Sequence, residues 1–338
     1  METFAALLDR ALAQRQALFA SLRAEQTDAW RVFHGAVEGL PGVVVDRYGD
    51  LLLVQLFRAA PADLDVDALV AAVEARRAAC GIEGETAEIV VVDRRAGPAG
   101  RQVDTSRAQR EEFVAHEGGM RFLVRARHEG QDPWLFLDLR AGRRALRALA
   151  PGRSVLNLFA YTCTTGLAAA LAGASEVQNV DFSATWLDVG RRNARLNELR
   201  SDRIRFLRED CLAVLRQLAG QTVGRYGEAE RHARIEQRTY DLVFLDPPRL
   251  SKSSLGRVDL VSDYQTLFKP AWLTVAEGGH LLATNNVASV PLDSWLDQLR
   301  RCATKAGRPI RTLDVITPDT DFPSPDGRPP LKLAVCGV

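Results

Sequence analysis

The feature that most constrains the fold is an alternation of short apolar runs and helical stretches after about residue 125. The apolar runs are residues 154–159, 176–180, 204–207, 241–245 and 280–284, and helical patterns follow them at 166–172, 183–199, 212–218, 261–275 and 292–302. Strands that are apolar throughout and alternate with helices are typical of a parallel sheet covered on both faces. The alternation therefore predicts a doubly wound α/β domain, and residues 318–338 predict an antiparallel closing hairpin.

The first part of the chain has a different pattern. Residues 3–23 repeat apolar side chains at the helical period, and two β-rich runs between 30 and 57 meet at a tight turn. A helix over 65–79, a strand over 89–92 and a hairpin over 113–124 complete a small α+β module. We predict an N-terminal helix at 1–27, an α+β domain at 28–120 and the α/β domain at 121–338.

Cysteine spacing and hydropathy limit the class of protein. The five cysteines are scattered without a CxxC or a Cys/His cluster, so no metal site and no disulfide framework is predicted. No apolar run approaches the roughly 18 residues of a membrane span, and the N-terminus lacks a signal-peptide core. We expect a cytoplasmic protein with no membrane partner.

The charge balance hides an asymmetry. The 338 residues carry 44 Lys and Arg against 43 Asp and Glu, a formal net charge of +1. Residues 1–120 hold 13 basic and 19 acidic side chains, and residues 121–338 hold 31 and 24. The basic excess is sharpest over 121–153, with eight Arg and three acids. Arginine suits phosphate contacts, but a GC-rich genome would also enrich it.

Acidic residues follow successive strands of the predicted sheet. Asp181 ends the second strand, where a carboxylate can accept bonds from a ribose diol, and Asp210 follows the third, where it can accept an adenine amine. Asp246-Pro247-Pro248 follows the fourth strand and stiffens its exit. The first turn, over 157–166, lacks the GxGxxG of a dinucleotide site. Each acid alone is commonly a helix N-cap, but the ordered series predicts S-adenosylmethionine binding.

Several motifs carry a family resemblance. They are Arg31-Val32-Phe33-His34-Gly35, Gly39-Leu40-Pro41-Gly42, Asp46-Arg47-Tyr48-Gly49-Asp50, Phe136-Leu137-Asp138-Leu139-Arg140, Asn157-Leu158-Phe159-Ala160-Tyr161-Thr162 and Asp246-Pro247-Pro248. With them, residues 29–338 resemble the bacterial class I rRNA methyltransferases. The resemblance implies a Rossmann-like methyltransferase domain with a mixed seven-stranded sheet, preceded by a small α+β domain with an RNA-binding role. Cys163-Thr164 replaces the family's usual small Gly pair in the cofactor turn.

Two branches of this family differ after the fifth strand. A cytosine-C5 enzyme needs a thiolate there, because C5 is not nucleophilic unaided. This chain reads Ala283-Thr284-Asn285-Asn286-Val287, and we interpret all five cysteines as packed structural thiols. The Asn pair, Asp210-Cys211-Leu212-Ala213, Ser251-Lys252-Ser253 and Asp321-Phe322 resemble instead the guanine-N7 half of the fused 23S rRNA enzyme.

The resemblance assigns the site residues. Cofactor contacts are expected from Asp138, Arg140, Asn157, Phe159, Ala160, Tyr161, Thr162, Asp181, Asp210, Asp246 and Pro247. Catalytic positioning of guanine is expected from Asp246, Asn285 and Asn286, and RNA contacts from Pro248, Arg249, Ser251 and Lys252. A strand-end turn is the structural alternative for the Asn pair.

We expect a methyltransferase that uses S-adenosylmethionine and acts on 23S rRNA or a ribosomal precursor particle. The alternatives are a cytosine-C5 enzyme, an RNA-binding assembly protein without catalysis, and a methyltransferase for protein or small molecules. The sequence leaves open the target nucleotide, the oligomeric state and the role of a polar insertion at 219–239.

Overall fold

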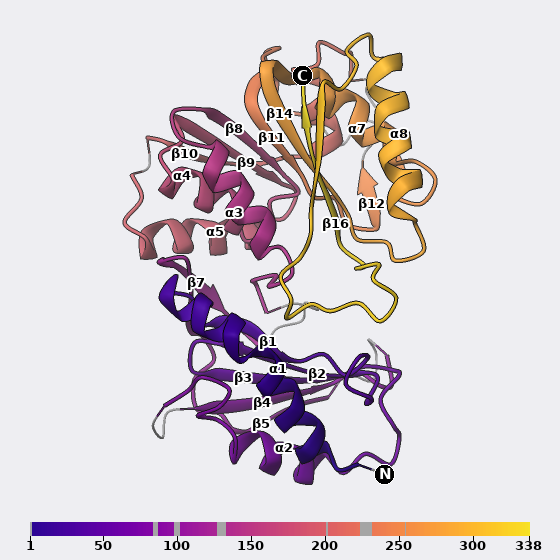
Figure 1. Cartoon of the computed structure of the whole chain (residues 1–338). Helices are drawn as coiled ribbons and strands as arrows, with labels where there is room; N and C mark the ends of the chain where they lie inside the picture. The colour runs from indigo at the N-terminus through magenta and orange to yellow at the C-terminus, as the bar shows by residue number, and fades with distance from the viewer. Residues whose placement is uncertain are drawn as a thin grey trace. The chain divides into compact units, whose positions relative to one another are not determined.

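The computed structural model describes residues 2–83, 87–97, 102–126, 133–200, 202–223, 232–253 and 255–338, without the side chain of Lys252. The chain forms two compact units, each made of two segments. Unit 1 comprises residues 1–140 and 319–327, and unit 2 comprises residues 141–318 and 328–338. Figure 1 shows the path of the chain through both units.

Unit 1 is a five-stranded sheet with helices on one face. Its elements are α1 (Phe4–Ala24), β1 (Ala29–Phe33), β2 (Val43–Tyr48), β3 (Leu51–Leu56), α2 (Val66–Glu74), β4 (Glu88–Asp93), β5 (Gln102–Arg107), β6 (Phe113–Glu117) and β7 (Met120–Val124). The strand order is β1-β2-β3-β4-β5, in which only β3 and β4 are parallel, and β6 and β7 form a separate hairpin. Thr3 and Asp65 cap α1 and α2 with side-chain oxygens.

Unit 2 is built on a seven-stranded mixed sheet. Its strands are β8 (Ser154–Leu158), β9 (Glu176–Asp181), β10 (Ile204–Arg208), β11 (Tyr240–Leu245), β14 (Val275–Asn285), β15 (Thr312–Ile316) and β16 (Lys332–Gly337). The order β10-β9-β8-β11-β14-β16-β15 places β8 at the centre of five parallel strands. β16 runs antiparallel to both of its neighbours. The doubly wound sheet and its mixed closing edge confirm the predicted fold class.

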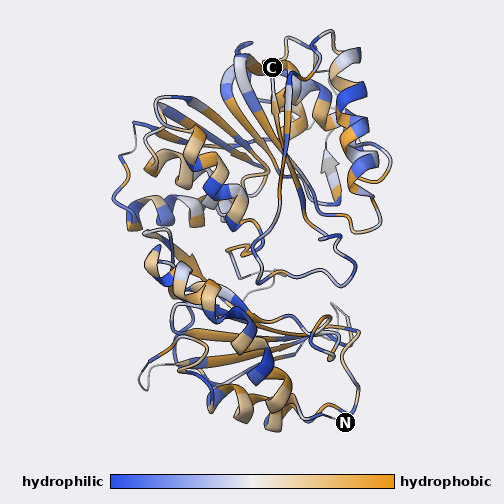
Figure 2. Ribbon diagram, viewed as in Figure 1, coloured by the Kyte–Doolittle hydropathy of each residue, from blue (hydrophilic) through white to orange (hydrophobic). Residues whose placement is uncertain are grey.

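Helices cover both faces of the sheet in unit 2. They are α3 (Arg140–Leu149), α4 (Thr164–Leu171), α5 (Ala184–Leu196), α6 (Cys211–Leu218), α7 (Tyr264–Leu273) and α8 (Leu292–Lys305). α4 and α5 pack on β8, β9 and β10, while α6, α7 and α8 share the main hydrophobic core with the sheet. Figure 2 shows strands that are largely hydrophobic and an α8 that is mixed, as expected for a helix with one buried face.

Three elements and the domain limits differ from the sequence-based expectations. The sequence does not predict β5, β15 or the hairpin of β12 (Leu250–Ser253) with β13 (Gly256–Asp259), because these strands are short, and β5 and β15 are largely exposed and lack a clear apolar run. The first compact unit ends at residue 140 instead of 120 and regains residues 319–327. Residues 319–327 are distant in sequence from the rest of unit 1, so no local pattern indicates that they belong to it. The insertion at 219–239 forms no helix or strand where it is described; residues 224–231 lie outside the described ranges.

Candidate active site at the carboxyl edge of the unit 2 sheet

Five parallel strands end at one edge of the unit 2 sheet. The register places Leu158 of β8 beside Leu245 of β11 and Val180 of β9. The residue after each of these is Phe159, Asp246 or Asp181, respectively. Ligands in open α/β sheets bind outside the carboxyl ends of the strands, where neighbouring connections diverge to opposite faces. The predicted site residues of unit 2 lie in the last residues of these strands and in the segments that follow them.

The connection from β8 to α4 has an unusual backbone. Phe159, Tyr161 and Cys163 all have positive φ, at 55°, 50° and 61°. Residues other than glycine rarely occupy this left-handed region, and each costs on the order of 1–3 kcal/mol unless its surroundings impose it. Such strain concentrates at functional sites. The turn predicted to hold the cofactor is therefore the most distorted segment of the unit 2 backbone that the structure describes.

Neighbouring elements hold this turn in place through its backbone. The Ala160 N–H donates to the Val180 carbonyl at 3.0 Å, and the Tyr161 N–H donates to Asp181 Oδ2 at 2.8 Å. The Phe159 N–H donates to the sulfur of Cys211 at 3.2 Å. The Asn193 side chain on α5 donates to the Thr162 carbonyl at 3.3 Å. Contacts from β9, α5 and α6 thus fix successive peptide groups of the turn.

Asp181 is a buried carboxylate at the end of β9. Its second oxygen accepts the Ser183 N–H at 2.9 Å, and burial raises the pKa of the carboxyl above its usual value. A carboxylate has about four acceptor positions, so two bonds to backbone leave capacity for hydroxyl donors. The next residue, Phe182, is 68% exposed, which is unusual for a large aromatic side chain. An acceptor followed by an open aromatic face suits a ribose joined to a purine.

Asn157 lies beneath the turn. Its side-chain amide donates to Asn179 Oδ1 at 2.8 Å, and Asn179 donates to the Arg205 carbonyl at 3.2 Å. Both side chains are buried, and a Cβ on Gly166 at the start of α4 would approach Asn179 Oδ1 within 2.0 Å. Asn157, predicted as a cofactor contact, is thus bonded across the sheet, where it supports the first turn of α4.

The acids after β10 have local structural roles. Asp210 Oδ1 caps α6 through the Leu212 N–H at 2.9 Å, and Oδ2 accepts the Ser253 hydroxyl at 2.6 Å. Glu209 accepts the Ala233 N–H at 2.8 Å and lies 2.9 Å from His232 Nδ1. Burial alone would raise the pKa of Glu209, but the hydrogen bonds that its carboxylate accepts outweigh burial, and the pKa lies below its usual value. The N-cap alternative for Asp210 is therefore present, and its bond to Ser253 ties α6 to the unexpected β12–β13 hairpin.

Asp246 and the end of β14 form the next part of the edge. Asp246 accepts a short hydrogen bond from the Thr284 hydroxyl, and the Thr284 carbonyl accepts the Tyr264 hydroxyl at 2.7 Å. Pro247 is buried behind the half-buried Asp246. Asp246 is therefore placed by the neighbouring strand and by α7, as expected for a rigidly presented acid.

The two asparagines after β14 occupy different environments. The Asn285 side chain is fully buried, and its Oδ1 accepts the Val287 N–H at 2.9 Å in a local turn. Its Nδ2 has no hydrogen-bond partner among the described residues. Asn286 is exposed. Buried Lys332 donates to the Val287 carbonyl at 2.8 Å and to the Pro330 carbonyl at 2.9 Å, which fixes this turn from β16.

The predicted RNA contacts follow Asp246 along the chain. Pro248 and Arg249 are exposed, whereas Ser251 is buried within β12. The side chain of Lys252 lies outside the described residues. The structure thus presents the first two side chains to solvent at the start of the β12–β13 hairpin, and it packs the third.

Asp138 and Arg140 belong to unit 1. Asp138 is half-buried, and Arg140 is 2% exposed. Arg140 donates from Nε to Asp319 at 2.7 Å, from Nη1 to the Ala29 carbonyl at 2.9 Å and from Nη2 to Asp321 at 2.6 Å. All three guanidinium nitrogens are thus bonded within unit 1.

Several contributors to this edge had no sequence signal. Phe182, Asn179, Asn193 and Lys332 act through burial, exposure or contacts between segments distant in sequence. Thr284 is the last residue of the predicted fifth strand, and the sequence gives it no role of its own. A hydroxyl or amide inside an apolar run is the only sign of these roles, and alone it does not distinguish a buried polar bridge from a surface position.

The donor set matches the predicted cofactor. A buried carboxylate with an exposed aromatic neighbour, further acids after the next strand, and a backbone-rich turn offer acceptors, a stacking face and close approach to one bound molecule. A cluster of three or more His, Cys, Asp or Glu side chains able to hold a metal ion does not occur in the described part of the chain.

A family model for S-adenosylmethionine-dependent methyltransferases matches residues 30–333. The chain belongs to this family. It is 33% identical over 318 residues to a ribosomal RNA large subunit methyltransferase of Deinococcus radiodurans, covering 92% of this chain and 72% of that protein. It is 28% identical to ribosomal RNA large subunit methyltransferase I of Shewanella amazonensis, covering 95% and 76%. The chain is therefore an S-adenosylmethionine-dependent methyltransferase, and the predicted cofactor is confirmed.

Solved structures of methyltransferases share the fold. SMU.776, a candidate methyltransferase complexed with SAH, aligns with 99% of this chain and 81% of its own at a TM-score of 0.80 and 22% identity. Trm5b from Pyrococcus abyssi aligns at a TM-score of 0.56 and 14% identity, covering 90% of this chain and 77% of its own. These likenesses confirm the class I methyltransferase fold. Of the helices that the structure describes, none has the length and hydropathy of a membrane span.

Proposed function

We propose that this methyltransferase acts on large-subunit ribosomal RNA and transfers the methyl group to guanine N7 without a covalent enzyme intermediate. The rRNA substrate is inferred from the relatives, which are ribosomal RNA large subunit methyltransferases. The choice of N7 over cytosine C5 rests on one observation. The end of β14 carries Thr284, Asn285 and Asn286, and no thiol.

The cysteines elsewhere do not supply the missing nucleophile. Cys80, Cys163, Cys211 and Cys336 are buried, and burial raises the pKa of each thiol, to about 12 for Cys80 and Cys336. Cys302, on α8, is half-buried, and burial raises its pKa as well. A nucleophilic cysteine needs a thiolate near neutral pH. These thiols are instead protonated packing groups.

Guanine N7 needs less from the protein. It has a free lone pair, so it can attack a methyl group on a sulfonium directly, and the bound cofactor supplies that activated methyl. The protein must align the base and bind its edges. Asp246 can accept from guanine donors, and an amide both donates and accepts. Asn286 is exposed at the strand end. The Nδ2 of Asn285 is a buried donor without a hydrogen-bond partner among the described residues, and a bound base or a water could accept from it.

Nucleoside mass spectrometry tests the reaction. Purified enzyme, S-adenosylmethionine and large-subunit rRNA that lacks the modification should yield 7-methylguanosine. Formation of 5-methylcytidine alone would refute the N7 assignment, and the absence of any methylated nucleoside on naked RNA and on precursor particles would refute the rRNA assignment.

Matched variants test the asparagines. Asn286→Ala should lower turnover at least tenfold with little change in cofactor affinity, because this exposed side chain at the strand end is proposed to hold the target base and not the cofactor. Ser289→Ala, an exposed neighbour, should retain activity. Equal losses of turnover and cofactor affinity in Asn286→Ala would contradict its role in holding guanine.

A further inference from the structure

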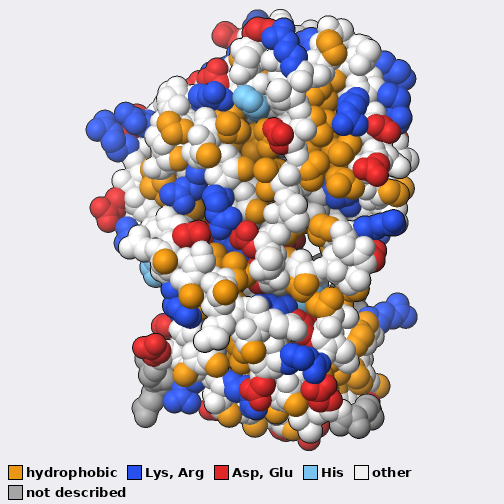
Figure 3. Space-filling view, viewed as in Figure 1, with side chains coloured by type: hydrophobic (Ala, Val, Ile, Leu, Met, Phe, Trp, Pro, Cys, Tyr) orange, Lys and Arg blue, Asp and Glu red, His pale blue; other side chains and the backbone are white. Residues whose placement is uncertain are grey.

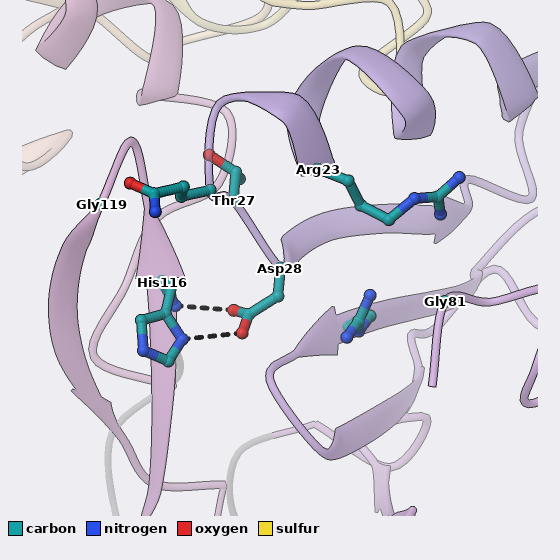
Figure 4. Close-up of a pocket in the computed structure, with 8 residues that line it drawn as sticks. Arg23, Thr27, Asp28, Gly81, His116 and Gly119 are labelled. Atoms are coloured by element: carbon teal, nitrogen blue, oxygen red, sulfur yellow. Dashed lines mark hydrogen bonds and ion pairs between the residues drawn. The ribbon is translucent and has the colours of Figure 1, made fainter. Parts of the chain in front are cut away.

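A basic pocket lies in unit 1, and the residues that line it have no role in the candidate active site. It has a volume of about 330 Å³ and is formed by the end of α1, the start of β1, the end of β2 and the β6–β7 hairpin. Its lining residues are Arg23, Gln26, Thr27, Asp28, Arg47, Gly81, His116 and Gly119. Figure 4 shows Thr27, Asp28 and His116 on one side and the Arg23 side chain on the other.

Arg47 is the central group of this pocket. It is 8% exposed, its Nε donates to the Gly49 carbonyl at 2.9 Å, and its guanidinium lies 4.4 Å from the centre of the Trp30 ring. A Cβ at Gly81 would lie 2.3 Å from Arg47 Nη1, so only glycine leaves room for this arrangement. Stacking and burial therefore hold one face of the guanidinium in a fixed orientation.

The positive charge of Arg47 is incompletely balanced. It forms no ion pair with any described carboxylate, and burial lowers its pKa. Burying a cation without a paired anion costs free energy that a bound anion recovers. Asp28 and, after it, Asp50 attract Arg47 electrostatically, but both Asp28 oxygens are bonded to His116, one to the backbone N–H at 2.6 Å and the other to Nδ1 at 2.8 Å.

A second arginine lies at the rim. Arg23 is exposed in the last turn of α1 and has no ion pair among the described residues. Arg23 and Arg47 line the same pocket. Of the two carboxylates that attract Arg47, Asp28 is hydrogen-bonded to His116 and Asp50 is paired with Arg110, so neither neutralises the two guanidinium groups of the pocket through an ion pair.

We propose that this pocket binds a backbone phosphate of the RNA substrate. Guanidinium groups bind phosphate through paired N–H donors. A guanidinium that is already held in one orientation by stacking, as Arg47 is, loses little conformational entropy on binding. The His116 nitrogen that does not face Asp28 can accept a ribose hydroxyl, because Nδ1 donates to the Asp28 carboxylate, and the exposed Gln26 amide can donate to a phosphate oxygen. The proposal deepens the proposed function, because it rests on RNA as the substrate.

The phosphate contact predicts a change in salt dependence. Each phosphate contact contributes about 0.7–0.9 to the slope of log K against log salt concentration. Arg23→Ala should weaken binding of a large-subunit rRNA fragment about three- to tenfold at low salt and reduce the slope by about one contact. Arg58→Ala is the matched control, because Arg58 is exposed in unit 1 and has no ion pair among the described residues. Arg58 follows the end of the paired strands β2 and β3 that is opposite to the end where Arg47 lies.

A second variant tests the paired N–H donors of the Arg47 guanidinium. Arg47→Lys keeps the charge but loses paired donation, so it should weaken RNA binding while thermal unfolding confirms a folded protein. Fluorescence anisotropy over a range of salt concentrations measures both variants, and methyl transfer to rRNA is measured in parallel. Wild-type affinity and slope in Arg23→Ala, or equal losses in Arg58→Ala, would overturn the phosphate site while leaving the proposed function intact. A wild-type enzyme that neither binds nor methylates rRNA would overturn both.

Discussion

At the residue scale, the acids of the candidate active site serve the fold and the site together. Asp181 and Asp210 bond backbone N–H groups of adjacent elements, so the same carboxylates that were predicted to face the cofactor also shape its surroundings. Their positions could be predicted, because an acid after a buried strand is visible in the sequence. Their partners could not, because Ser253 and Tyr161 come from other elements.

Cys211 offers a residue-scale test of the cofactor turn. Its sulfur accepts the Phe159 N–H, so Cys211→Ala should leave that donor unsatisfied and raise the dissociation constant for S-adenosylmethionine several-fold. Cys211→Ser restores an acceptor and should recover part of the affinity. Isothermal titration calorimetry measures both; equal affinities for Ala and Ser would show that the sulfur does not position the turn.

Asp241 provides a pH-dependent test. It accepts the Ser154 N–H at 2.8 Å and the Ser154 hydroxyl at 2.7 Å, and these bonds lower its pKa below 3.8. A carboxyl with a depressed folded pKa stabilises the protein above its unfolded pKa and loses that contribution as the pH falls through the folded value. Asp241→Asn should therefore be less stable than wild type at pH 7, with a difference that shrinks as the pH falls below about 4, the ordinary pKa of an aspartate. Urea denaturation measures it, and a difference constant with pH would contradict the assignment.

At the element scale, strands and helices with strong periodicity were predictable, and polar elements were not. The five parallel strands and the closing strand β16 followed from apolar runs. β12 and β13 are short, polar and defined by pairing with each other, which local pattern does not encode. The left-handed turn was also hidden, because Phe159 and Tyr161 are not residues that favour positive φ.

The packing of α5 on this turn can be tested with a double-mutant cycle. A Cβ at Gly190 would lie 2.6 Å from Cys163 Sγ, so Gly190→Ala should destabilise the protein by about 1–3 kcal/mol through overpacking. Cys163→Gly removes the obstructing atoms and permits positive φ at 163. The double variant should regain much of the loss in urea unfolding. Additive losses would show that the two elements are not coupled through this contact.

At the scale of the whole molecule, charge and connectivity matter more than composition. Figure 3 shows basic side chains interspersed with acidic ones on the visible face of each unit. Unit 1 holds 17 Lys and Arg against 25 Asp and Glu, and unit 2 holds 27 against 18, so the net charge of +1 describes neither unit. Because basic and acidic side chains are mixed, RNA binding should depend on a few phosphate contacts. The sequence could predict this asymmetry of charge, but it could not predict that residues 319–327 complete unit 1.

The returning segment is held by a buried ion pair. Arg140 is 2% exposed, Asp321 is 0% exposed, and Asp321 also accepts the Arg31 N–H at 3.0 Å. Asp321→Ala would leave a buried guanidinium with one carboxylate fewer and should lower the free energy of unfolding by about 3–5 kcal/mol. Asp202→Ala, which breaks an exposed pair with Arg200, should cost less than about 1 kcal/mol. Chemical denaturation compares them, and similar small losses would show that Asp321 does not anchor the segment.

The two-segment construction of each unit has a consequence for protein engineering. Unit 1 cannot be transplanted as one continuous piece, because residues 319–327 reach it only after the chain has passed through most of the methyltransferase sheet. A chimera that exchanges residues 1–140 alone would pair a foreign Arg140 with the resident Asp319 and Asp321. Exchange of unit 1 between relatives therefore requires two simultaneous grafts, one near each end of the gene.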